Sequence, residues 1–145
     1  MDRKYQFTSD TFAQCRQTWP NIFDLIKWDP HRKCRVVEIG SYEGQATVWI
    51  LDNLIQHPDS KVWCIDPFKV TGRKEQELNP STVEDWNLIL QRFKSNIALI
   101  GKANQVELLQ KPSSVALSSL LATEAGQVDF IYVDGSHRRP MSYQT

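Results

Sequence analysis

The chain has 145 residues, of which 41% are hydrophobic and 23% charged, a composition typical of one soluble globular domain with a sizeable core. Its 17 basic and 17 acidic residues balance, which disfavours nucleic acid or an anionic membrane as a partner and makes a small molecule the default ligand. No apolar stretch approaches the roughly 20 residues that span a bilayer, and the polar N-terminus lacks the apolar core of a secretory signal.

The three cysteines indicate a reducing compartment. Cys15, Cys34 and Cys64 are an odd number and lack the spacing of metal ligands. Cys64 falls in the middle of an apolar run, where a buried free thiol is the expected state. We therefore expect a cytoplasmic protein whose thiols stay reduced.

The first half of the chain alternates helical and strand patterns. Apolar residues recur at helical spacing over residues 9–28, and Pro20 is expected to break or kink that segment. A short β-branched run over residues 36–39 predicts a buried strand. An amphipathic helix of about three turns is expected over residues 46–54, and a second strand over residues 62–65.

The second half continues the alternation. A polar loop over residues 67–80 leads to the clearest helix, which begins at a capping box formed by Ser81 and Glu84 and runs to Ile100. The remaining predicted elements are a third strand over residues 106–109, a helix capped by Ser113 or Ser114, and a fourth strand over residues 128–133 that ends in Asp134-Gly135-Ser136-His137.

Strands that alternate with helices predict an α/β protein with a Rossmann-like, doubly wound parallel sheet of about four strands. Ligands of such sheets bind beyond the carboxyl ends of the strands. The residues expected at those ends are Gly40, Asp66, Ser113 and Asp134. Because four strand ends meet at one edge, we expect a binding site there.

The turn after the first strand, Gly40-Ser41-Tyr42-Glu43-Gly44, argues against two common nucleotide sites. It has two glycines where a dinucleotide fingerprint has three. Glu43 places negative charge where a pyrophosphate would need to approach the helix N-terminus. The sequence also lacks the glycine-rich lysine motif of a P-loop.

Two carboxylates near neighbouring strand ends favour a different nucleoside. Glu38 lies in an apolar strand, where an ionised carboxylate is costly unless it is paired or bound. A cofactor with an amino group and a sulfonium would supply compensating charge, whereas the structural alternative is a salt bridge to Arg35 or Lys33 on the rim. Asp66 ends the next strand, where a carboxylate can accept two hydrogen bonds from a ribose diol.

These motifs carry a family resemblance. The segments VVEIGSYEG, VWCIDPF and VDFIYVDGSH resemble the first, second and fourth strand-end motifs of class I S-adenosylmethionine-dependent methyltransferases. The likeness is closest to a bacterial branch that includes small-molecule and sugar O-methyltransferases. It implies the N-terminal part of a class I methyltransferase fold, with residues 1–30 as an N-terminal helical segment and residues 31–145 as a truncated S-adenosylmethionine-binding domain.

The resemblance also assigns roles by position. The cofactor-binding residues that it implies are Glu38, Gly40, Ser41, Gly44, Asp66 and Ser113. Glu38, Gly40 and Gly44 would line the methionine part. Asp66 would hold the ribose hydroxyls, and Ser113 would flank the adenine. Pro112 stands where the family often has an acidic residue.

The fourth motif carries the expected catalytic residues. In metal-assisted relatives its aspartate is a ligand of a divalent cation, so Asp134 would bind Mg²⁺ and hold the acceptor oxygen close to the methyl group. His137 would act as a general base or as a second ligand. The alternatives are a solvated turn residue for Asp134 and a locally bonded rim residue for His137.

The resemblance stops after His137, although the family's sheet continues with a helix and further strands; only RRPMSYQT follows here. We therefore expect a truncated chain whose fourth strand lies at an exposed apolar edge, through which copies could associate into a homo-oligomer. A frameshift near Arg139 is one explanation, and the DNA sequence past codon 145 would test it.

The leading functional prediction is S-adenosylmethionine-dependent methyl transfer to an oxygen of a small molecule or sugar, with activity impaired by truncation. The first alternative is a non-catalytic nucleotide-binding or pseudo-enzyme domain. The second is an NAD-dependent oxidoreductase, which the missing middle glycine and Glu38 disfavour.

Overall fold

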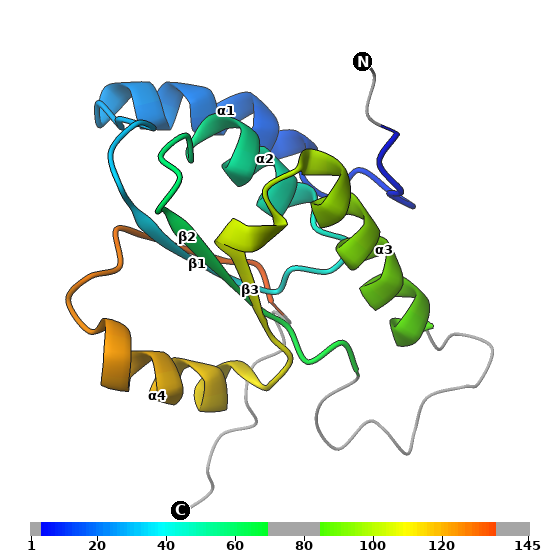
Figure 1. Cartoon of the computed structure of the whole chain (residues 1–145). Coiled ribbons are helices and arrows are strands. Elements are labelled where there is room, and N and C mark those ends of the chain that lie inside the picture. The colour runs from blue at the N-terminus through cyan, green and yellow to red at the C-terminus, as the bar shows by residue number, and fades with distance from the viewer. Residues whose placement is uncertain (1–3, 70–84, 136–145) are drawn as a thin grey trace, which may run out of the picture.

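The computed structural model describes residues 4–69 and 85–135 (Figure 1). Strands and helices alternate along it, as the sequence predicted. In chain order the elements are α1 (Ala13–Leu25), β1 (Arg35–Ile39), α2 (Gln45–Asn53), β2 (Lys61–Ile65), α3 (Trp86–Ile100), the short 3-10 helix η3 (Ala103–Gln105), β3 (Val106–Leu109), α4 (Ser113–Glu124) and β4 (Phe130–Val133). Among these described residues no helix is long and apolar enough to cross a membrane.

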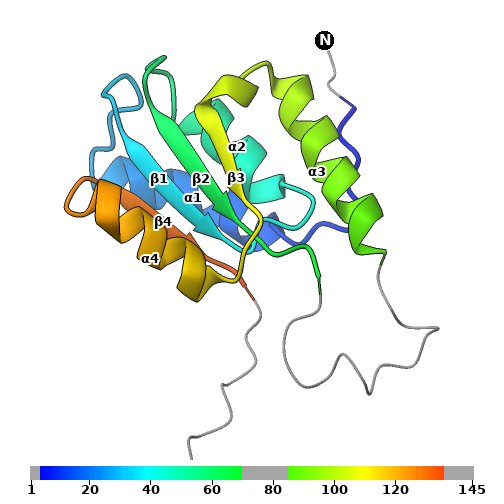
Figure 2. The same cartoon turned by 60° about the horizontal axis from the view of Figure 1, so that its bottom comes forward.

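The described strands form one parallel sheet in the order β3-β2-β1-β4. The register pairs Ile39 with Ile65 on one side and with Val133 on the other, so the carboxyl ends of β1, β2 and β4 finish level. Helices α1, α2 and α3 cover one face of this sheet and α4 covers the other, as Figure 2 shows. The doubly wound α/β prediction is confirmed.

The larger core cluster lies under α1, α2 and α3. Trp19 and Phe23 of α1 are buried in it, and the ring of Trp19 meets Tyr132 of β4 edge-on at 4.7 Å. The predicted break at Pro20 is wrong, because α1 continues through Pro20 to Leu25. Proline costs this helix one backbone hydrogen bond, and the burial of the two flanking aromatic rings offsets that loss.

Two helices begin differently from the sequence prediction. Helix α3 starts at Trp86, and its N-cap is Asp85, whose carboxylate accepts a hydrogen bond from the Leu88 amide at 3.1 Å. The predicted capping pair of Ser81 and Glu84 lies outside the described residues. The predicted serine cap of α4 is wrong, because Pro112 is the N-cap and makes no side-chain cap bond. Ser113 already lies inside the helix, beyond the position from which a hydroxyl caps the first turn.

The face that α4 covers is only partly closed. Ala116 and Leu120 of α4 are buried, and they pack against Val37 and Trp63 of the sheet. A groove of about 360 Å³ remains between α4 and β4. Large apolar side chains exposed on α4 and β4 are Leu117, Leu121, Ile131 and Val133. Strand β4 is therefore an edge strand of the described sheet with an uncovered apolar face, as expected.

Candidate functional site

The ends of three strands meet at the turn Gly40–Gly44. The Gly40 amide donates a hydrogen bond to the carbonyl of Ile65 in β2, and the Asp134 amide donates one to the carbonyl of Ile39 in β1, each at 2.8 Å. A Cβ atom at Gly40 would lie 2.4 Å from the carbonyl oxygen of Asp134, and Gly40 has a φ of +86°. Only glycine fits such a position without strain.

The rest of the turn is tightly wound. Gly44 is the N-cap of α2 with a φ of +85°, and its amide donates to the carbonyl of Ser41 at 2.8 Å. Tyr42 has a φ of +47°, which a residue with a Cβ seldom adopts and which costs about 1–2 kcal/mol. The Tyr42 amide donates to Asp66 Oδ2 at 3.0 Å, and this bond helps to hold the strained residue in place.

Glu38 lies directly beneath this turn and is completely buried. Its Oε2 atom accepts hydrogen bonds from the Ser41 hydroxyl at 3.0 Å, from the Cys64 thiol at 3.4 Å and from the Thr47 hydroxyl. Its Oε1 atom is buried and has no hydrogen-bond partner. An unpaired oxygen of this kind is costly unless a ligand meets it.

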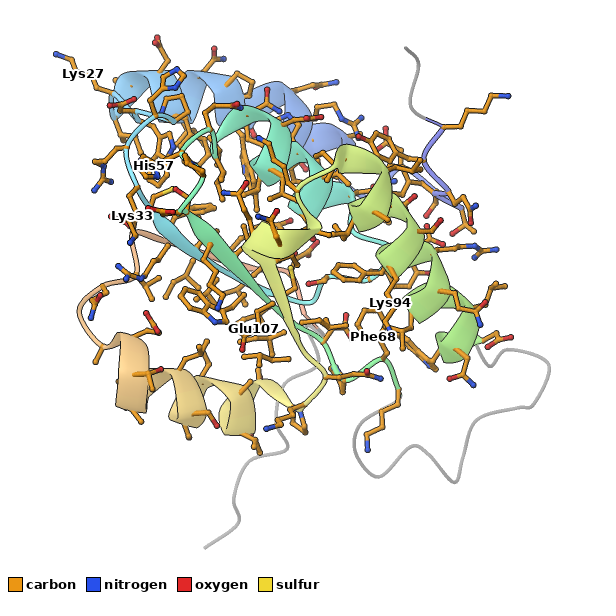
Figure 3. The ribbon with its side chains drawn as sticks, in the orientation of Figure 1. Lys27, Lys33, His57, Phe68, Lys94 and Glu107 are labelled. Atoms are coloured by element: carbon orange, nitrogen blue, oxygen red, sulfur yellow. The ribbon has the colours of Figure 1, made fainter. Side chains whose placement is uncertain are left out.

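The salt-bridge alternative for Glu38 is wrong. The Arg35 guanidinium pairs with Glu124 of α4 at 3.1 Å, and Lys33 is exposed on the loop before β1 (Figure 3). Side chains alternate between the two faces of a strand, and Glu38 lies on the α2 side, where it meets Thr47. The carboxylate thus has only uncharged donors around it.

Burial raises the pKa of Glu38 to about 7, against the opposing effect of the hydrogen bonds from Thr47, Ser41 and Cys64. The charge of nearby Asp66 raises it further. A cationic ligand next to Glu38 would favour its ionised form. Burial also raises the pKa of Cys64, which therefore stays a thiol.

Asp66 is almost fully buried at the end of β2, and its two oxygens have different backbone partners. Oδ2 accepts from the Tyr42 amide at 3.0 Å, and Oδ1 accepts from the Phe68 amide at 2.8 Å. Phe68, labelled in Figure 3, packs its ring against Phe93 of α3 with 5.6 Å between the ring centroids. Each carboxylate oxygen can accept a second hydrogen bond, so Asp66 can fix the turn and still bind a ligand hydroxyl.

The structure brings Glu38, Gly40, Ser41, Gly44 and Asp66 together around one turn. Asp134 adjoins them through its backbone contact with Gly40, at the same edge of the sheet, as the sequence predicted. Ser113 is exposed at the first residue of α4, after the neighbouring strand β3. His137 and Ser136 lie outside the described residues, and so does most of the predicted loop over residues 67–80.

The exposed carboxylate of Asp134 is held by its own strand. Oδ2 accepts a hydrogen bond from the Tyr132 hydroxyl at 3.0 Å, and the Cys15 sulfur of α1 lies 3.7 Å from the same hydroxyl. Burial, followed by these hydrogen bonds, raises the pKa of Tyr132. Within residues 4–69 and 85–135, no three His, Cys, Asp or Glu side chains gather as a metal site. The described residues thus do not supply the ligand set that Mg²⁺ would need beside Asp134.

Sequence reasoning misread Glu43 and overlooked Thr47. Glu43 is 1% exposed, and its carboxylate binds Thr8 of the N-terminal segment and Arg92 of α3. It is therefore a structural anchor of the turn. Thr47 donates to Glu38 from the first turn of α2. The signal for Thr47 was a hydroxyl three residues after the last glycine of the turn, whereas the sequence carried no signal for the partners of Glu43.

Comparison with known proteins identifies the family. A sequence profile of the family described as "Methyltransferase domain" matches residues 37–144, well over half of the chain. The chain belongs to this methyltransferase-domain family. Among curated proteins no match was found.

Solved structures share the fold. One, described as a candidate O-methyltransferase from Klebsiella pneumoniae, superposes with a TM-score of 0.57 at 21% identity and covers 88% of this chain. Another is the O-methyltransferase TomG from Streptomyces achromogenes, involved in tomaymycin synthesis and solved with S-adenosylmethionine; it has a TM-score of 0.53 at 18% identity and covers 92% of this chain. The match covers 46% of the first protein and 56% of the second, so this chain spans about half of their length.

Proposed function

We propose that the chain binds S-adenosylmethionine at the turn Gly40–Gly44 and serves methyl transfer to an oxygen of a small molecule or sugar. The observation that carries the proposal is the buried Glu38, whose Oε1 has no partner although it lies beneath a glycine turn. A cationic amino group close to a sulfonium is the ligand chemistry that such a carboxylate suits.

The remaining contacts follow from the positions of the strand ends. The backbone of Gly40, Ser41 and Gly44 would border the methionine part of the cofactor, because the positive φ of the two glycines folds this turn over the end of β1. Asp66 would accept hydrogen bonds from the ribose diol, as acidic residues at this place in α/β sheets do. Ser113 would border the adenine from the start of α4. Membership of the methyltransferase-domain family and the S-adenosylmethionine bound to TomG support this assignment.

Methyl transfer from a sulfonium needs little covalent help from the protein, since an acceptor oxygen displaces the thioether in one step. Positioning of the acceptor and removal of its proton supply most of the acceleration. We assign these tasks to Asp134, whose carboxylate is oriented by Tyr132, and to His137. The described residues alone hold no ligand set for Mg²⁺.

Calorimetric titration tests the cofactor assignment. S-adenosylhomocysteine, the unreactive product, is expected to bind the chain, whereas NADH is not. Glu38→Ala and Asp66→Ala are each expected to weaken binding by about 1–3 kcal/mol, the cost of losing a charged hydrogen-bond partner. Asp59→Ala, which removes an exposed carboxylate between α2 and β2, is the matched control and should leave the affinity unchanged. Unchanged affinity in both site variants, or tighter binding of NADH, would reject the proposal.

A non-catalytic, cofactor-binding protein is the second candidate. It is favoured by the engagement of the Asp134 carboxylate within its own strand, since Oδ2 already accepts a hydrogen bond from the Tyr132 hydroxyl at 3.0 Å. Incubation with S-adenosylmethionine carrying a labelled methyl group separates the two candidates. Label transferred to a catechol or sugar acceptor supports the enzyme, and cofactor binding without transfer to any acceptor supports the second candidate.

A further inference from the structure

We call residues 4–12 the N-terminal strap and the turn Gly40–Gly44 the cofactor turn. The strap runs beside α3 and the cofactor turn (Figure 2). It contains no strand, and it precedes α1. The side chains that hold its backbone are Glu43 and Gln45, at the end of the turn and the start of α2, and Asn96 of α3. All three are buried.

Asn96 joins the strap to the turn. Its side chain is fully buried, and its Nδ2 donates to the Glu43 carbonyl at 2.8 Å and to the Gln6 carbonyl at 3.2 Å. Its Oδ1 accepts from the Gln6 amide at 2.7 Å. One amide side chain therefore bonds both to the backbone of the turn and to both backbone groups of a strap residue.

Glu43 makes the second connection. Its Oε2 accepts from the Thr8 amide at 2.7 Å, and its Oε1 accepts from the Thr8 hydroxyl at 3.0 Å and from Arg92 at 3.1 Å. Glu43 follows Tyr42 directly, and the Tyr42 amide is bonded to Asp66. Asp66 and Thr8 thus hold neighbouring residues of the turn from its two sides.

Gln45 completes the attachment at the start of α2. Its Oε1 accepts from the Thr11 hydroxyl and from the Phe12 amide, each at 3.1 Å, and its Nε2 donates to the Ser9 carbonyl. If the strap left, the buried groups of Glu43, Gln45 and Asn96 would each lose partners. Leaving buried polar groups unpaired costs about 1–3 kcal/mol each, more for the carboxylate. Detachment of the strap therefore favours rearrangement of the turn.

We infer that Asn96 and Glu43 are positioning residues for the cofactor turn, and that through them binding of cofactor and attachment of the N-terminal strap stabilise each other. The inference rests on the proposed function, because it takes the turn to be the cofactor site. Coupling between two equilibria is reciprocal. Bound cofactor therefore stabilises attachment of the strap by the same free energy by which the attached strap stabilises cofactor binding. A purely structural role would lower stability without this mutual effect.

The first measurement uses the full chain and hydrogen–deuterium exchange. The reporter is a peptic peptide that covers residues 4–12, which contains the Gln6 and Thr8 amides bonded to Asn96 and Glu43. Saturation with S-adenosylhomocysteine is expected to slow its exchange at least about fivefold, the lower end of typical coupling. Exchange that is unchanged by bound ligand would overturn the inference.

The second measurement is the affinity for S-adenosylhomocysteine in strap variants. Asn96→Ala removes the junction, and Thr8→Pro removes the amide and hydroxyl donors to Glu43 from a residue outside every helix and strand. Each is expected to raise the Kd at least about fivefold. Asn53→Ala is the matched control, because the exposed Asn53 amide donates to the Trp49 carbonyl within α2.

The outcomes separate the inference from the proposed function. If the parent chain does not bind S-adenosylhomocysteine, both fail. If folded Thr8→Pro binds S-adenosylhomocysteine with the same affinity as the parent chain, only the coupling fails. Should Asn96→Ala not fold, Thr8→Pro and the exchange measurement on the parent chain still decide the question, because neither needs that variant.

Discussion

Gly40 lies directly against the backbone of Asp134: a Cβ atom at Gly40 would be 2.4 Å from the Asp134 carbonyl oxygen and 2.6 Å from its carbonyl carbon. The two residues come from the ends of neighbouring strands β1 and β4. The turn Gly40–Gly44, for which we propose a cofactor role, and the predicted catalytic aspartate are therefore placed relative to each other by direct backbone contact.

Gly40→Ala should therefore destabilise the protein strongly. The new methyl group meets backbone that cannot move aside easily, and the φ of +86° is unfavourable for alanine, for a combined cost of about 2–5 kcal/mol. Gly101→Ala is the control, because Gly101 has a φ of +76° with nothing within 4 Å of the added Cβ; it should cost about 1–2 kcal/mol. Urea unfolding measures both, and equal losses would contradict the close contact.

Glu38 should make the protein less stable as the pH rises. Its pKa is about 7 in the folded protein against an ordinary value of 4.5, so the folded state holds the proton more tightly. The contribution of Glu38 to the free energy of unfolding is therefore greatest below about pH 4.5. It falls by on the order of 3 kcal/mol as the pH rises to about 7. Subtracting the unfolding curves of Glu38→Gln from those of the parent chain between pH 5 and 8 isolates this effect. A parent-minus-variant difference that does not change with pH would show that burial does not raise the pKa.

Affinity for the cofactor should increase with pH over the same range. A cationic amino group favours ionised Glu38. Below pH 7 Glu38 is mostly protonated, so part of the binding free energy is used to remove its proton. The Kd for S-adenosylhomocysteine is expected to fall by about tenfold from pH 6 to pH 7.5, with proton release to the buffer. Glu38→Gln should bind more weakly and without this dependence. Proton uptake on binding, in place of release, would show that the cationic amino group of the ligand does not lie next to Glu38.

The uncovered apolar face should make copies of the chain associate as concentration rises. Ile131 is 53% exposed on β4 beside the groove, so Ile131→Lys should keep the chain monomeric at higher concentration. Leu99→Lys is the control, because Leu99 is 45% exposed on α3, away from this face. Light scattering after size-exclusion chromatography compares the three proteins. Equal association in both variants would mean that contacts form elsewhere.

The strands and their alternation with helices along the chain could be predicted because their signals are local. The β-branched run that ends at Ile39 and the apolar run that ends at Ile65 each identify a buried parallel strand without knowledge of the rest. The carboxylates of Glu38 and Asp66 follow from those strand ends. The predicted break at Pro20 failed because the packing of Trp19 and Phe23 outweighs a local preference.

The attachments of the turn could not be predicted, because they join distant residues. Thr8 is 35 positions from Glu43, and Gln6 is 90 positions from Asn96. Nothing in the sequence near Glu43 distinguishes a buried, bonded carboxylate from an exposed one. The Glu43 carboxylate that argued against a pyrophosphate is buried and bound to the strap and to Arg92.

The placement of the tryptophans gives this chain a built-in optical reporter. Trp19, Trp28 and Trp49 belong to the aromatic cluster beneath α1, and Trp63 lies in the core under α4. The indole of Trp86 instead meets the ring of Tyr42, in the turn proposed to bind the cofactor, edge-on at 6.3 Å. A change in tryptophan fluorescence on adding a nucleoside would thus originate chiefly from Trp86. In Trp86→Phe the fluorescence should no longer change on ligand binding but should still change on unfolding.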